Sequence, residues 1–264
     1  MAKVFLLIFI FLSVFLRRAA ADSVRITTGE WAPYTSHTLP NDGLLSEIAR
    51  AAFADQGITM TLAFFPWGRA DQLSKSGEWD GTIAYAKNRD REKYFLFSDP
   101  LYVGKYVLFH LKKHPLEWNT LADLKNVPMA STIAFGGMGQ EFLDAEKAGQ
   151  LKVERLPSDV QSFNMLFNDR VRAVPSDLEV GLFLIKKNFP NEMSRVTYSS
   201  HPIKNSEYRL VISKKNPLAA KLIESFNKGL KNLKTSGRYK KILNKWKTIS
   251  PRDNTSIARL KIES

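Results

Sequence analysis

The chain has 264 residues, of which 44% are hydrophobic and 25% charged, with a formal net charge of +13 at pH 7 and no cysteine. This composition is typical of a globular protein and excludes an intrinsically disordered one. The absence of cysteine excludes disulfides, a thiol-linked lipid anchor and a cysteine nucleophile, so burial of a core must supply the stability. Its length allows one large or two modest domains.

The first 21 residues predict a removable secretory signal peptide. A short basic start is followed by an apolar run over 4–16, which is too short for a membrane span of roughly 20 residues. Three alanines at 19–21 supply a small-residue cleavage pattern, so we expect cleavage after Ala21 and a periplasmic protein. Arg17 and Arg18 are atypical at their position between the run and the cleavage site, and a retained anchor is the alternative.

The positive charge is concentrated near the C-terminus. Removing the signal takes away three basic residues and leaves a net charge of +10, while segment 214–247 alone has eleven Lys or Arg against one acid, Glu224. Basic helices can bind nucleic acid or anionic membranes, but export argues against nucleic acid. Apolar residues from Leu222 to Leu233 recur at helical spacing, which predicts one core face and a solvated lysine face.

The first half of the chain alternates predicted strands and helices. The β-α-β-α-β order implies a parallel sheet covered by helices. We expect strands at 24–28, 58–64 and 81–85, and helices at 43–53 and 68–76.

A second α/β unit begins near Tyr106. We expect strands at 107–111, 129–133, 151–156, 171–174 and 208–213, and helices at 121–124, 140–147, 160–167 and 178–187 before the basic helices. Two such units joined by extended segments leave a cleft, and clefts between domains are common small-molecule sites that close by hinge motion.

Four ordered motifs carry a resemblance to a known family. They are DGTIAYAKNRDREKYFLFSDPLY over 80–102, GEWAPY over 29–34, DRVRAVPSD over 169–177 and GRYKKILNKW over 237–246. Together they resemble the bacterial extracellular solute-binding proteins of family 3, the polar amino-acid receptors of ABC importers and their relatives. The resemblance covers nearly all of residues 23–249 and is much less specific for the ligand than for the family.

The resemblance implies an α/β, two-lobed periplasmic-binding-protein fold of type II. Each lobe is expected to be a sheet flanked by helices, and two strands form the hinge. The implied division is a signal peptide at 1–21, lobe I at 22–106 and 205–264, and lobe II at 107–204. A periplasmic solute-binding protein of this kind captures a small polar ligand, an amino acid or related carboxylate, and presents it to an inner-membrane ABC permease. We expect a monomer with no cofactor, no metal and no nucleic-acid partner.

The resemblance also implies the anchors of the ligand. Arg91, seven residues before Ser98, matches the arginine that grips the α-carboxylate, and a guanidinium can do so through two parallel hydrogen bonds. Arg89 is the competing candidate, because this stretch is one residue shorter than in many relatives. Asp177 matches the partner of the amino group, and the alternative role for this residue is the N-cap of the helix at 178–187.

Aromatic residues are expected to line the ligand's side chain. Trp31 and Trp67 match the positions that sandwich it in relatives, with two core tryptophans as the alternative. Tyr85 is a further candidate at the rim, as are Tyr34 and Arg69.

The glycine-rich turn before the helix at 140–147 completes the expected site. Gly137 and Met138 lie where relatives bind a carboxylate at a helix N-terminus. This turn lacks the hydroxyl side chains of relatives, and Arg172 replaces the first acid of the 169–177 motif. A modified amino acid or another small carboxylate is therefore as compatible as a standard one.

Two other classes of function stay open. An enzyme on the same fold, such as a cyclohexadienyl dehydratase-like lyase, needs a general acid, for which Glu30 is the candidate; its alternative is an exposed loop carboxylate. A ligand-sensing partner of a membrane receptor is the third hypothesis. His110 and His114 are four residues apart, but no third metal ligand is evident, and both are expected at the surface.

Overall fold

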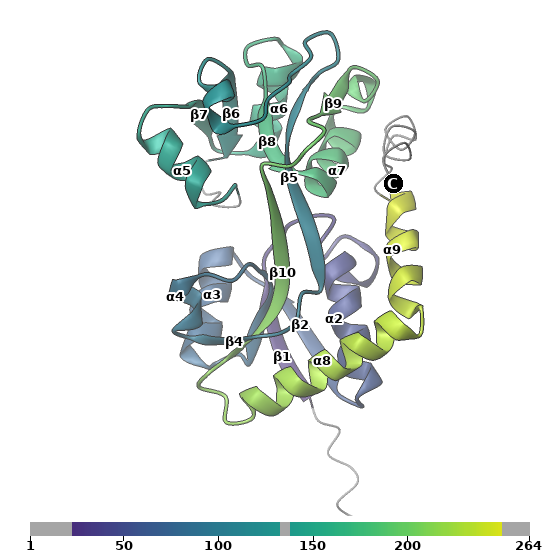
Figure 1. Cartoon of the computed structure of the whole chain (residues 1–264). Helices are drawn as coiled ribbons and strands as arrows, with labels where there is room; N and C mark the ends of the chain where they lie inside the picture. Colours follow the sequence, from purple (N-terminus) through teal and green to yellow (C-terminus); the bar gives the residue numbers. More distant parts are fainter. Residues whose placement is uncertain (1–22, 133–137, 250–264) are drawn as a thin grey trace, which may run out of the picture.

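The computed structural model of the chain describes residues 23–132 and 138–249 (Figure 1). The signal peptide predicted at 1–21 and the candidate Gly137 lie outside these residues. Within them, no helix is long and apolar enough to cross a membrane.

Two lobes are joined by a pair of long strands (Figure 1). The strands are β1 (Ser23–Thr28), β2 (Thr59–Phe64), β3 (Gly81–Tyr85), β4 (Phe95–Phe97), β5 (Tyr102–Leu111), β6 (Pro128–Thr132), β7 (Lys152–Leu156), β8 (Val174–Asp177), β9 (Val196–Tyr198) and β10 (Lys204–Ser213). The helices are η2 (Pro40–Asp42), α2 (Leu44–Asp55), α3 (Trp67–Ser76), α4 (Arg89–Glu92), η3 (Leu121–Leu124), α5 (Gln140–Lys147), α6 (Asp159–Phe167), α7 (Leu178–Asn188), η4 (Pro190–Glu192), α8 (Ala219–Thr235) and α9 (Arg238–Ile249).

The main sheet runs from one lobe into the other in the order β2-β1-β3-β10-β5-β8, with β4 on β10 and β9 on β5. In lobe I, β1 pairs in parallel with both β2 and β3, as the β-α-β-α-β pattern predicted. In lobe II, β6 and β7 form a separate parallel pair. The two-lobed α/β fold expected from the sequence is confirmed.

β5 and β10 are the two crossing strands. They pair in antiparallel register from Lys204 opposite Tyr106 to Tyr208 opposite Tyr102. The lobe boundaries expected at 106–107 and 204–205 fall within these strands. Their length exceeds the predicted strands at 107–111 and 208–213, because each strand continues from one lobe's core into the other's.

One predicted strand is misplaced. The sequence predicted 171–174, but the strand is β8, Val174–Asp177, because these residues pair with β5 from Phe109 to Tyr106. Arg172 and Ala173 instead donate their backbone N–H groups to the carbonyl of Pro128. The shift matters because Asp177 then ends a buried strand and also caps the helix that follows.

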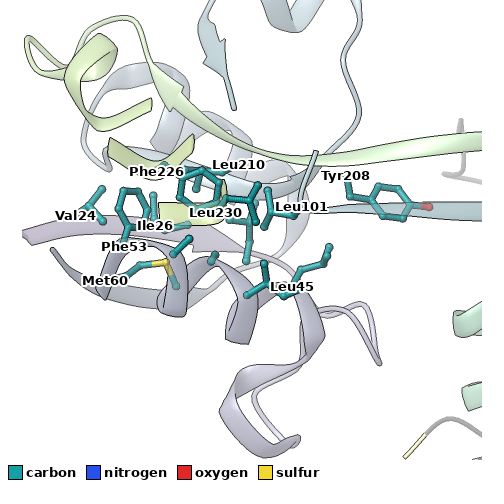
Figure 2. Close-up of a cluster of buried hydrophobic side chains, with 14 of the residues drawn as sticks. Val24, Ile26, Leu45, Phe53, Met60, Leu101, Tyr208, Leu210, Phe226 and Leu230 are labelled. Carbon is teal, nitrogen blue, oxygen red and sulfur yellow. The ribbon is translucent and has the colours of Figure 1, made fainter. Parts of the chain in front are cut away.

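The core of lobe I lies between its sheet and helices α2 and α8 (Figure 2). Phe53 of α2 and Phe226 of α8 contact each other edge to face, with ring centroids 5.0 Å apart. The helices approach closely at Gly229, where an added Cβ atom would lie 2.0 Å from the carbonyl oxygen of Ala52. The predicted core face of the basic segment is confirmed: Leu222, Phe226, Leu230 and Leu233 are all buried.

The prediction that His110 lies at the surface is wrong. Its side chain is buried on β5, with 6% of the residue exposed. Burial lowers the pKa of this imidazole, since hydrogen bonds to neighbouring backbone only partly offset the loss of solvent.

Candidate functional site in the cleft between the lobes

Asp177 lies at the contact between the lobes and is only 1% exposed. Its carboxylate caps α7, accepting hydrogen bonds from the N–H groups of Glu179 (3.1 Å) and Val180 (3.3 Å) at Oδ1. The hydroxyl of Tyr34 donates to the same oxygen at 2.8 Å, and that of Tyr208 donates to Oδ2 at 2.8 Å. The capping role foreseen from the sequence is therefore present, together with two tyrosine contacts that the sequence did not indicate.

Burial raises the pKa of Asp177 to about 7, and the nearby charge of Glu179 adds to this rise. The hydrogen bonds from Tyr34, Tyr208 and Val180 lower the pKa, but they offset only part of the effect of burial. At neutral pH this carboxyl is thus close to its midpoint of ionisation. A group with this pKa is a weaker electrostatic partner for an ammonium ion than a fully ionised carboxylate.

A glycine makes this arrangement possible. An added Cβ atom at Gly104 would lie 2.4 Å from Oδ2 of Asp177 and 2.5 Å from Cε2 of Tyr208. Any larger residue at this place on β5 would push the carboxylate and the phenol apart.

Trp31 belongs to the same contact. Its ring lies 4.8 Å from that of Tyr34 and 4.9 Å from that of Tyr208, centroid to centroid. Tyr34 is in turn 5.5 Å from Tyr102. Trp31 is partly buried in this aromatic group, which the lobe I loop and the crossing strands build together.

A second aromatic group in lobe I brings together three of the predicted site residues. The rings of Trp67 and Tyr85 lie 6.4 Å apart, and the guanidinium carbon of Arg91 lies 4.0 Å above the Tyr85 ring. Trp67 is 36% exposed, so it is not a core tryptophan. Its indole N–H donates to the carbonyl of Glu30, next to Trp31 in sequence, at 3.3 Å.

The two arginine candidates differ in their surroundings. Arg91 is partly buried and donates from Nη1 to the carbonyl of Ala86 at 2.8 Å, whereas Arg89 is exposed. Among the described residues, no carboxylate forms an ion pair with Arg91. That single bond uses one of the five N–H groups of the guanidinium, and the other four can still bind a carboxylate.

The backbone before Tyr85 is unusual. Ala84 has a φ of +69°, a conformation that costs a non-glycine residue about 1–3 kcal/mol. The pairing of β3 with β10 is irregular at this point, between Arg209 and Val211. No sequence pattern signals this distortion, which lies directly beside the Tyr85 and Arg91 contact.

A narrow cavity of about 10 Å³ lies between the lobes. Trp31 forms its lobe I wall, and the lobe II wall consists of Ser131, Asp159, Pro175, Ser176, Asp177 and Val180. Sequence reasoning missed Ser131 and Asp159, because neither lies in a motif and only the packing of β6 against α6 brings them to the cleft. A groove of about 410 Å³ runs along α8, is lined by exposed lysines and lies away from these residues.

Met138 is 2% exposed and packs in the lobe II core with Trp118 and Phe142. Tyr34, expected at the rim, is fully buried, and Arg69 is exposed with its guanidinium over Phe65. In the described parts of the chain, no group of three or more His, Asp or Glu side chains is arranged to hold a metal ion.

Fold and cleft together define a protein of the two-lobed periplasmic-binding type. The profile described as "Bacterial extracellular solute-binding proteins, family 3" matches residues 24–249, and the chain belongs to this family. No curated protein matches it.

Solved structures share the fold at low sequence identity. A histidine kinase sensor domain with similarity to periplasmic binding proteins has a TM-score of 0.68 and 20% identity, covering 87% of this chain and 97% of its own. The GluR0 ligand-binding core from Nostoc punctiforme in complex with L-glutamate has a TM-score of 0.65 and 20% identity, covering 84% and 98%. An ancestral arginine-binding protein bound to arginine has a TM-score of 0.65 and 23% identity, covering 85% and 97%.

Proposed function

We propose that this protein captures an amino acid or a related small carboxylate between its lobes and presents it to an ABC-type importer of the inner membrane. Membership of the family supports capture of a solute. Structures with this fold hold glutamate or arginine, which supports an amino acid as the class of ligand.

The observation that carries the proposal is the state of Arg91. Its guanidinium is partly buried, stacked on Tyr85 beside Trp67, and paired with no described carboxylate. An aromatic ring holds this guanidinium in place, and most of its N–H groups donate to no described partner. Such a group is well suited to bind the carboxylate of a small ligand. Trp67 adds an exposed aromatic face for the rest of the ligand.

Calorimetric titration of the mature protein with the twenty standard amino acids and a set of small carboxylic acids tests this function. We expect at least one ligand to bind, and Arg91→Ala to weaken its binding by about tenfold or more, since hydrogen bonds to charged groups contribute about 1.5–3 kcal/mol. Arg89→Ala is the matched control, because Arg89 lies on the same short helix and is exposed. Unchanged affinity in Arg91→Ala contradicts the assignment.

The lyase alternative receives no support at Glu30. Its side chain is about half exposed, and His37 donates to it through its backbone N–H at 3.0 Å and contacts it through its ring. The pKa of Glu30 lies below its ordinary value, because partial burial, which raises the pKa, is outweighed by the hydrogen bonds from His37. A general acid for dehydration at neutral pH needs the opposite shift.

Ligand sensing is the second candidate function, since a kinase sensor domain shares this fold. An adjacent permease and ATPase in the genome favour import, whereas a lone gene or a neighbouring sensor kinase favours sensing. Both roles place the protein outside the cytoplasm, and N-terminal sequencing of exported protein tests cleavage after Ala21.

A further inference from the structure

The surplus positive charge of the chain lies on the segment that ends lobe I. Residues 214–247 contain eleven Lys or Arg against one acid, which equals the whole +10 of the chain without its predicted signal. The segment comprises the turn after β10, α8 and most of α9. Helix α8 runs along the end of lobe I that points away from lobe II (Figure 1). The charge is therefore concentrated on one side of the molecule and not spread over its surface.

The lysines of α8 keep this charge available to a partner. Lys221, Lys228 and Lys231 are exposed, and none of them forms an ion pair with another residue that the structure describes. By contrast, Arg238 and Lys245 of α9 form ion pairs with carboxylates of α2. The opposite face of α8 is buried in the lobe I core, so the helix is fixed in place and presents its lysines to solvent.

A groove along α8 brings several of these charges together. It has a volume of about 410 Å³, and Lys228, Lys231 and Lys234 line it together with the hydroxyl-bearing Thr235. Asp99 is also on its wall, so three ammonium groups face one carboxylate. Ammonium and hydroxyl groups donate hydrogen bonds to phosphate oxygens, and charge on the donor strengthens such bonds. The groove therefore suits an anionic phosphate group.

Apolar side chains lie beside these lysines. Leu218, the N-cap residue of α8, is 53% exposed, and Lys214, Lys215 and Lys221 lie within four residues of it along the chain. Tyr94 is 45% exposed, and its carbonyl accepts a hydrogen bond from the backbone N–H of Lys214 at 2.8 Å. Exposed leucine and tyrosine among lysines are typical of surfaces that bind a bilayer, where apolar groups enter the interface and ammonium groups stay near the phosphates.

We propose that α8 and the turn before it dock lobe I on the anionic phospholipid surface of a membrane. The chain belongs to an extracellular family, so membrane surfaces are within its reach. Each lysine close to such a surface strengthens binding about fivefold, and salt screens the attraction. An acidic protein also matches the charge, but it needs a broader apolar patch to bury than Leu218 provides, whereas a bilayer accepts single apolar side chains.

Docking through this surface leaves the cleft free. The groove is lined by residues of α8 and by Asp99, whereas the cavity between the lobes is lined by Trp31 and residues of lobe II. The inference goes beyond the capture of a ligand, because it concerns where the protein resides and does not depend on which ligand the cleft takes.

Flotation of the mature protein with lipid vesicles tests the proposal. We expect the wild type to bind vesicles that mix phosphatidylglycerol with phosphatidylcholine, to ignore vesicles of phosphatidylcholine alone, and to be released at high salt. The triple variant Lys221→Gln/Lys228→Gln/Lys231→Gln should lose on the order of a hundredfold in affinity, at about fivefold per lysine. Lys234 is left unchanged, because its ammonium donates to the carbonyl of Pro100 at 3.3 Å.

The matched control is Lys125→Gln/Lys147→Gln/Lys187→Gln, which removes the same charge from exposed lysines of lobe II. It should bind the anionic vesicles almost as well as the wild type, and both triple variants should keep the wild-type midpoint of thermal unfolding. The proposal is overturned if the wild type does not distinguish the two kinds of vesicle, or if both triple variants lose binding equally. It is also rejected if these lysines bind an acidic protein while the wild type ignores the vesicles.

Discussion

Replacing Asp177 with asparagine should flatten the dependence of folding stability on pH. The pKa of this carboxyl rises from the ordinary 3.8 to about 7 on folding because of burial. Between about pH 4 and pH 7 the folded protein thus keeps a proton that the unfolded chain has lost. Stability must therefore fall as the pH rises through this window and then level off above it.

The size of the effect follows from the shift. At about 1.4 kcal/mol per pKa unit, the contribution of Asp177 to the free energy of unfolding falls by at most roughly 4 kcal/mol between pH 4 and pH 8. Asparagine cannot ionise, so this part of the slope disappears in Asp177→Asn. The variant should be about 1–3 kcal/mol less stable at pH 4.5, because its amide NH₂ cannot accept a hydrogen bond from Tyr34 or Tyr208, whereas both oxygens of the protonated carboxyl still can. That deficit should shrink or reverse by pH 8.

Urea unfolding followed by tryptophan fluorescence at pH 4.5, 6 and 8 measures these stabilities, with Asp144→Asn as the exposed control. Asp144→Asn should run parallel to the wild type across the range. If Asp177→Asn also runs parallel, Asp177 is ionised throughout, and the hydrogen bonds to its carboxylate outweigh its burial.

Two further variants test the contact between the lobes. Tyr34→Phe removes one hydrogen-bond donor to Asp177 and should lower the free energy of unfolding by about 1–2 kcal/mol, which a lower midpoint of thermal unfolding reports. The control Tyr94→Phe, at an exposed ring, should change the free energy of unfolding by less than about 0.5 kcal/mol. Gly104→Ala places a methyl group 2.4 Å from the Asp177 carboxylate and should cost about 1–3 kcal/mol in chemical denaturation. Gly68→Ala, with nothing within 4 Å of the new methyl group, should be neutral or slightly stabilising, and equal effects of the two substitutions would contradict the packing argument.

Local patterns along the chain specified much of the fold. Helical spacing of apolar residues placed α2 and the core face of α8 to within a few residues. The alternation of strands and helices predicted that the strands of lobe I are parallel, because two successive parallel strands need a crossover connection, which is usually a helix. Errors arose where pairing with a distant strand set the limits, as at β8, whose extent is fixed by β5.

The candidate site was predictable only in part. The motif around 80–102 brought Tyr85 and Arg91 to attention, and the structure stacks one on the other. The sequence could not show that Arg91 is partly buried while Arg89 is exposed, because both lie on one short helix and only its packing distinguishes them.

What the sequence determined by itself was the family, the succession of elements and the residues most suited to hold charged groups. What only the tertiary structure decided was which of these groups remain available. Tyr34 and Asp177 are 143 residues apart in the chain and form a hydrogen bond across the contact between the lobes. Ser131 and Asp159 belong to no motif and meet at one cavity because β6 and α6 pack together. The spacing of apolar residues in a helix or strand depends only on residues close in sequence. The hydrogen-bond partners of a buried carboxylate, in contrast, come from every chain segment that folding brings around it.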